Sequence, residues 1–133
     1  MISFVDLHTS EPYKIFHDLY KKALSKNQKN IEAIVISSFN KGKNEVDSRY
    51  VNIKMMKEKD FIFFSNYNSK KARQFESNKN IAALFYWNKI NTQIRMKAKI
   101  YKLEKSLSDM HFKDRLKEKN ALAISSMQSM HVD

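Results

Sequence analysis

The stretch TQIRMKAKIYKL, residues 92–103, alternates apolar and polar side chains more regularly than any other part of the chain. One face of the resulting strand would carry only apolar side chains, namely Ile94, Met96, Ala98 and Ile100. The opposite face would carry polar ones, namely Gln93, Arg95, Lys97 and Lys99. A period of two over this length predicts a β-strand with one buried face.

Outward from this strand, four more are predicted at 31–39, 45–56, 61–64 and 81–87, joined mostly by short polar turns. Gly42, the only glycine, lies in the first turn, where we expect a positive φ. A helix over 12–26 should open at Ser10-Glu11-Pro12 and cover the sheet with an apolar stripe of Ile15, Phe16, Leu19, Tyr20 and Leu24. Shorter helices are predicted over 69–77 and 106–118, and the apolar run 121–124 precedes a polar tail.

Five strands with tight turns predict an antiparallel β-barrel in one domain spanning 1–133, because parallel strands would need helical crossovers between most pairs. One face of each strand would be buried. The other face would meet water, helices or a second subunit, and an outward-facing Tyr50, Phe63 or Trp87 would favour the subunit.

Composition excludes several kinds of site. With no cysteine, the chain has no disulfide, thiolate zinc site or cysteine nucleophile, and one glycine cannot build a phosphate-binding loop or a serine-hydrolase elbow. The four histidines show no metal-ligand spacing, so no metal site is expected. No apolar run reaches the roughly 18 residues of a membrane span, so we expect a cytoplasmic protein with no membrane partner.

Cations and hydroxyls gather near predicted strand ends. They are Arg49 and Lys54, then Ser65, and then Ser69, Lys70 and Lys71 at the start of a helix. Such a set suits a phosphate monoester, although a solvated face beside a capped helix explains it equally well. In a regular strand Arg49 and Lys54 would point to opposite faces, so a shared ligand would require a bulge, a strong twist or a ligand that wraps the strand end.

These residues resemble the pyridoxamine (pyridoxine) 5′-phosphate oxidase family, whose members are FMN enzymes with a dimeric, antiparallel split β-barrel. SRYVNIK (residues 48–54) is similar to the family's R-x-V-x-x-K strand. The block from FIFFSN through SKKA to ALFYW (61–87) and the strand NTQIRMKAKIYKL (91–103) follow in the family's order without gaps, as does MQS (127–129). The match spans roughly residues 11–130.

The resemblance implies FMN contacts from four regions. They are the strand residues Arg49, Tyr50, Val51, Asn52, Ile53 and Lys54; the residues Phe64, Ser65, Ser69, Lys70 and Lys71; Gln93; and, from the last segment, Gln128 and Ser129. Main-chain groups near Val51 and Asn52 would approach the flavin ring, and Lys70 and Lys71 the phosphate. Lys54, His111, Arg115 and Lys119 would bind a small phosphorylated substrate. The family's cofactor sits between two subunits, so a homodimer would supply residues from both chains.

The chain departs from the family pattern at several positions. Phe64 occupies a position where the family often has Tyr, and Lys70 replaces the usual Arg. His111 replaces a Tyr of the family, and Lys119 replaces a Ser. It also ends at Asp133, before the family's C-terminal FMN- and substrate-binding strands, so we expect a short form of the family.

The family reaction oxidises pyridoxamine or pyridoxine 5′-phosphate and reduces O2, so the resemblance implies a role in pyridoxal phosphate biosynthesis. Two alternatives compete with this expectation. The first is a flavin reductase or a flavin-binding protein without oxidase activity on the same fold. The second is a basic nucleic-acid-binding barrel, suggested by the net charge of +11 and by Phe63, Tyr67 and Trp87, which could stack on bases. Burial of these aromatics in the core or in a dimer contact is the simpler explanation.

Overall fold

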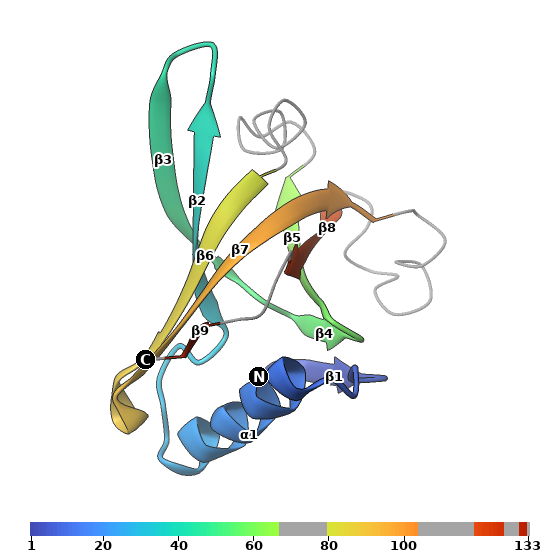
Figure 1. Ribbon diagram of the computed structural model, residues 1–133, viewed down its shortest axis with the longest axis vertical. Coiled ribbons are helices and arrows are strands. Elements are labelled where there is room, and N and C mark those ends of the chain that lie inside the picture. The colour runs from blue at the N-terminus through green and yellow to red at the C-terminus, as the bar shows by residue number, and fades with distance from the viewer. Residues whose placement is uncertain (67–79, 104–118, 127–130, 133) are drawn as a thin grey trace.

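One nine-stranded sheet contains every strand among the residues that this computed structural model describes, which are 1–66, 80–103, 119–126 and 131–132 (Figure 1). The strands are β1 (Ser3–Val5), β2 (Ala33–Asn40), β3 (Glu45–Asn52), β4 (Met55–Lys57), β5 (Asp60–Asn66), β6 (Asn80–Trp87), β7 (Thr92–Lys102), β8 (Lys119–Ser126) and β9 (His131–Val132). Their spatial order is β1-β4-β5-β8-β7-β6-β2-β3, and β9 pairs with β7.

Antiparallel pairing joins all neighbouring strands except β1 and β4, which run parallel. The predicted antiparallel class is therefore confirmed. The single strand predicted over 45–56 is wrong: β3 ends at Asn52 and β4 begins at Met55. Strands β1, β8 and β9 were not predicted, because β1 and β9 are short and the apolar part of β8, residues 121–124, shows no alternation.

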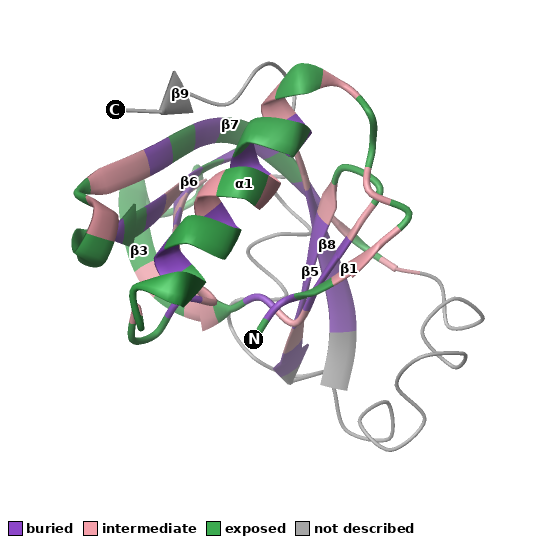
Figure 2. Ribbon diagram, turned by 90° about the horizontal axis from the view of Figure 1, so that it is seen from below, coloured by how far each residue is buried: buried purple, intermediate pink, exposed green. Residues whose placement is uncertain are grey.

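The inner face of the sheet forms the core. Along β7 the four apolar residues of the alternating pattern are buried at 3% exposure or less, and Arg95, Lys97 and Lys99 point outward, as predicted. Helix α1 (Glu11–Ser25) lies over this inner face, where its buried residues join those of β5, β6 and β7 (Figure 2). The predicted cover of the sheet by this helix is confirmed.

Aromatic rings make up the contact between α1 and the sheet. The Phe16 ring centroid lies 5.1 Å from that of Phe61, 5.3 Å from that of Phe85 and 5.5 Å from that of Trp87. The Trp87 indole N–H donates to the Ile31 carbonyl at 3.0 Å, so its polar atom is paired within the core. Burial of large rings is the main stabilisation available to a chain without disulfides.

The buried stripe of α1 differs from the predicted one. Phe16 and Tyr20 are buried as expected, but Ile15 and Leu24 are 41% and 38% exposed. Tyr13 and Ala23 are buried in their place, because the stripe follows positions 13, 16, 20 and 23 along one helix face. Pro12 occupies the first turn as predicted, while the hydroxyl of Ser10 pairs with His8 Nδ1 at 2.8 Å and does not cap the helix.

The β2–β3 hairpin ends on the side of the molecule opposite α1 (Figure 1). The predicted positive φ at Gly42 is wrong. Asn44 takes the left-handed conformation in this turn, with φ of 52°, and no glycine has a positive φ. Asparagine tolerates this region better than other residues with a side chain, so the turn forms without using its glycine.

None of the helices in the described parts of the chain is both long and apolar enough to cross a membrane.

Candidate functional site

Among the described residues, β3 is an edge strand of the sheet. It pairs with β2, and no strand among the described residues pairs with its other edge. The Ile53 N–H donates to the Glu32 carbonyl at 2.8 Å. Because backbone groups alternate along an antiparallel ladder, those of Ser48, Tyr50 and Asn52 point to the open side. This edge offers a row of N–H donors and C=O acceptors to a ligand.

Arg49 projects from the inner face of this strand. It lies opposite the buried Ile36 in the β2–β3 register and is half-buried. Burial lowers the pKa of Arg49, and the nearby Asp47 carboxylate partly offsets that effect. The guanidinium remains charged at neutral pH, but it has lost part of its hydration. A partly desolvated guanidinium is well suited to bind a phosphate or carboxylate.

Strand β5 places a hydroxyl on the same inner face. Phe61 and Phe63 are buried in the main core, and Ser65, two residues further along, is 9% exposed. Phe64 points to the other face and is half-buried. Strand β5 also contacts β3. Arg49 and Ser65 thus belong to two strands that contact each other.

Lys54 lies in the bend between β3 and β4. Its N–H donates to the Ile62 carbonyl at 2.8 Å, and its carbonyl accepts from the Ser3 N–H at 3.1 Å. The strand alternation that would place Arg49 and Lys54 on opposite faces ends at Asn52. The side chain of Lys54 is half-buried, whereas Ile53 beside it is fully buried.

Gln93 lies apart from the residues above. It belongs to the outer face of β7, opposite Tyr86 of β6, and is half-buried. Strands β2 and β6 separate β7 from β3. Within one chain, therefore, Gln93 and Arg49 lie on opposite faces of the sheet with two strands between them.

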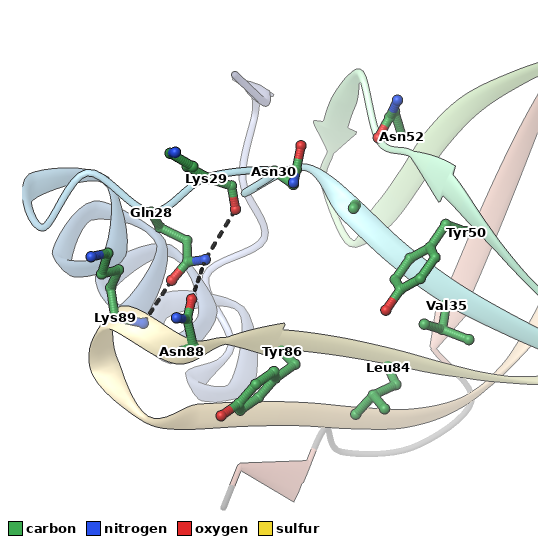
Figure 3. A pocket seen from close by; sticks show the side chains of 11 residues that line it. Gln28, Lys29, Asn30, Val35, Tyr50, Asn52, Leu84, Tyr86, Asn88 and Lys89 are labelled. Atoms are coloured by element: carbon green, nitrogen blue, oxygen red, sulfur yellow. Dashed lines mark hydrogen bonds between the residues drawn. The ribbon is translucent and has the colours of Figure 1, made fainter.

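A groove of about 720 Å³ lies on this outer face (Figure 3). Its floor comes from β2, β3 and β6 through Val35, Tyr50, Asn52, Leu84 and Tyr86, and its end from Gln28, Lys29, Asn30, Asn88 and Lys89. The Gln28 amide fixes that end. It donates to Asn88 Oδ1 at 2.8 Å and accepts from the Lys89 N–H at 2.8 Å.

Sequence reasoning did not identify Tyr86 or the end of the groove. Tyr86 stands between Phe85 and Trp87, which are 0% and 1% exposed, whereas Tyr86 itself is 60% exposed. The strand alternation was therefore a usable signal that Tyr86 points outward. No local pattern indicated that the connector at Gln28 would meet residues sixty positions later.

Several predicted site residues lie outside the described part of the chain: Ser69, Lys70, Lys71, His111, Arg115, Gln128 and Ser129. The predicted helices over 69–77 and 106–118 and the aromatic Tyr67 lie there too. Lys119 is the first residue of β8 and pairs with Asn66.

Two of the three aromatic residues that suggested nucleic-acid binding are buried. Phe63 and Trp87 are each 1% exposed and lie in the core, so neither can stack on a base. Of the three positions named as markers of a subunit contact, only Tyr50 points outward, and it is 72% exposed.

Comparison with known proteins identifies relatives over most of the chain. Residues 20–131 match the family model described as pyridoxamine 5′-phosphate oxidase. A pyridoxine/pyridoxamine 5′-phosphate oxidase from Hydrogenovibrio crunogenus is 32% identical over 127 residues, which cover 96% of this chain and 58% of that protein. One from Legionella pneumophila is 34% identical over 106 residues, covering 80% of this chain and 49% of the relative. The chain thus spans about half the length of these curated relatives.

Solved structures share the fold at much lower identity. A pyridoxamine 5′-phosphate oxidase-related, FMN-binding protein from Nostoc punctiforme aligns with a TM-score of 0.72 at 12% identity, covering 94% of this chain and 84% of that one. The heme storage protein HutZ from Vibrio cholerae aligns with a TM-score of 0.63 at 8% identity, covering 92% and 95%. The split barrel is thus common to an FMN-binding protein and a heme storage protein, whereas the family model and the sequence relatives agree on one family. This chain belongs to the pyridoxamine 5′-phosphate oxidase family.

Proposed function

We propose that this chain is an FMN-binding flavoprotein that acts as a homodimer and oxidises pyridoxamine or pyridoxine 5′-phosphate or a related small phosphorylated substrate. The observation that carries the proposal is the partly desolvated guanidinium of Arg49 beside the open edge of β3, in a chain of this family. FMN carries a phosphate at one end and a heterocycle with alternating donors and acceptors at the other, so it matches both features.

The residues present fit this cofactor. Arg49 supplies a cation for the phosphate end, and Ser65 supplies a hydroxyl from strand β5. The open backbone groups of Tyr50 and Asn52 can pair with the edge of the flavin ring without a specific side chain. Phe64 lacks a hydroxyl, so its contribution to the site would be a contact by the ring alone.

Residues outside the described ranges, together with Lys54, Gln93 and Lys119, complete this proposal. Ser69, Lys70 and Lys71 would bind the phosphate, and Gln93, Gln128 and Ser129 would contact the rest of the cofactor. Lys54, with His111, Arg115 and Lys119, would hold the phosphorylated substrate. When bound, the flavin would supply the two-electron redox chemistry of the reaction, with O2 as the final electron acceptor.

The test begins with the purified full chain. We expect it to bind FMN more tightly than riboflavin, which has the same ring without the phosphate, and to elute as a dimer. The FMN-loaded protein should consume O2 and water and convert pyridoxamine 5′-phosphate to pyridoxal 5′-phosphate, with release of ammonia and hydrogen peroxide. A protein that binds FMN but is reduced only by a nicotinamide cofactor would instead be a flavin reductase, and one that binds no flavin would refute the proposal altogether.

A further inference from the structure

Three cations form a row on the outer face of β7. Arg95, Lys97 and Lys99 occupy alternate positions of this strand, and all three are exposed. Side chains at alternate positions of a strand lie on the same face, about 7 Å apart along it. The row therefore presents three positive charges at even spacing along one straight element.

The strands beside this row place no acidic residue next to it. The residues opposite the three cations on β6 are apolar or neutral, namely Leu84, Ala82 and Asn80, in that order. On the other side, Ser125 of β8 lies between Lys99 and Asp60, and the Asp60 carboxylate accepts a hydrogen bond from the Tyr101 hydroxyl. Like charges at this spacing repel each other, so an anion with a matching spacing would be bound favourably.

The rest of this outer face is also free of acidic residues where the structure describes it. The two acids of β3, Glu45 and Asp47, alternate in step with Arg49 and therefore belong to the inner face. The groove on the outer face has Lys29 and Lys89 at its end, and no acidic side chain of the described residues lines it. The positive charge of the row thus continues toward the groove.

Tyr86 provides an exposed aromatic ring beside this row. It is 60% exposed and lies opposite Gln93, the outward residue that precedes Arg95 on the same face of β7. Figure 3 shows Tyr86 with Leu84 on the outer side of β6. Unlike Phe63 and Trp87, this ring is accessible to a planar group in solution. An exposed ring beside a row of cations is typical of surfaces on which unpaired bases stack.

We propose that the outer face of β6 and β7 binds single-stranded nucleic acid, whose phosphates contact Arg95, Lys97 and Lys99 while one unpaired base stacks on Tyr86. A single strand carries one negative charge per nucleotide along an extended backbone, so its charges form a row like that of the protein. An anionic membrane offers headgroups without linear order and gains nothing from such a row. None of the four residues is among those proposed to bind FMN or substrate, so the inference is independent of the proposed function.

Salt dependence tests the phosphate contacts. The full chain is titrated into a labelled single-stranded oligonucleotide of about 12 nucleotides at several salt concentrations. Three phosphate contacts predict that log Kobs falls against log salt with a slope of magnitude about 2 or more, and Lys97→Ala combined with Lys99→Ala should reduce that magnitude by about 1.4. Lys14→Ala combined with Lys22→Ala is the matched control, because it removes the same charge from exposed positions of α1 and should leave the slope unchanged. Equal reductions in both double variants would show that only net charge matters and would overturn the proposal.

Substitution of Tyr86 tests the base contact. Tyr86→Ala should weaken binding of the single strand at least about fivefold, whereas Tyr86→Phe, which keeps the ring, should bind nearly as tightly as the unaltered chain. A duplex of the same sequence has no unpaired base, so its binding should not respond to Tyr86→Ala. Thermal unfolding of each variant confirms that it is folded. Equal effects of Tyr86→Ala on single strand and duplex, or binding of anionic lipid vesicles without binding of the oligonucleotide, would refute the inference.

Discussion

The two faces of the strands β3, β2, β6 and β7 differ in what covers them. The inner face of β6 carries Phe85 and Trp87, which pack against Phe16 of the helix, whereas the outer face carries Tyr86 in water. Adjacent residues of one strand therefore have different roles. Burial on the inner face stabilises the fold, and the exposed outer face remains available for binding.

The largest expected effect is a difference in stability between substitutions at two neighbouring residues, Trp87 and Tyr86. Trp87→Ala should lower the free energy of unfolding by about 3–5 kcal/mol, because it opens a cavity in the aromatic core. It also leaves the Ile31 carbonyl without its donor. Tyr86→Ala, the matched change on the outer face, should lower the free energy of unfolding by only about 0.5 kcal/mol or less. Urea denaturation of both variants measures the difference, and similar losses would show that the outer face also belongs to the folding core.

A second prediction concerns ligand binding at the inner side of the open edge. Arg49→Ala should weaken FMN binding roughly 10- to 100-fold, because it removes a partly desolvated cation that would pair with the anionic phosphate end. Riboflavin binding should change little, since that ligand has no phosphate. Lys97→Ala removes the same charge from the outer face and serves as the control in the same titration. Equal weakening by both variants would indicate that only net charge matters.

A third prediction concerns a part of the outer face whose side chains are buried. Near β4, β5 and β8, Met55, Ile62 and Ala123 form a small buried cluster, with Tyr101 packed against it. The Tyr101 hydroxyl donates to the Asp60 carboxylate. Burial, followed by this hydrogen bond and the Asp60 charge, raises the pKa of Tyr101 well above its ordinary value of 10.0.

The sign of the pH effect follows from that shift. Above pH 10.0 the unfolded chain loses the Tyr101 proton while the folded chain keeps it, so stability should fall as the pH rises further. Tyr20, whose pKa is also raised by burial, contributes in the same direction. Tyr101→Phe should make the alkaline decline shallower, as measured by thermal unfolding between neutral pH and pH 11, whereas an unchanged slope would contradict the assignment to Tyr101.

The smallest expected effect lies within the open part of the outer face. The hydroxyls of Ser37 and Ser48 lie 2.7 Å apart across β2 and β3. Ser48→Ala should cost about 0.5 kcal/mol or less, because exposed cross-strand pairs are weak. A chemical denaturation curve that shifts by much more would mean that this face contributes to folding even without a partner.

Strand periodicity allowed much of the fold to be predicted from the sequence. The alternation in β7 and the apolar runs of β2 and β6 are strong signals, and their buried residues follow them. The turn between β2 and β3 was less predictable, because Asn44 and Gly42 can both adopt a positive φ and sequence does not decide between them. Ile15 was misassigned because a helix with many apolar residues allows more than one stripe.

Less of the candidate site than of the fold could be predicted from the sequence. Family motifs pointed to Arg49 and Gln93, but only the strand order shows that these residues lie on opposite faces with β2 and β6 between them. The groove depends on a contact between Gln28 and Asn88, which are 60 residues apart. Contacts at such a separation are determined by the tertiary fold, and no local pattern encodes them.

The chain has one tryptophan, and its indole sits beneath α1 with its N–H bound to a core carbonyl. Its emission therefore reports on a single known location without labelling. A shift of that emission to longer wavelength would report exposure of the Trp87 indole to water, and quenching of the same signal by added flavin would follow ligand binding through energy transfer. One natural chromophore can thus follow folding and ligand binding in the same sample.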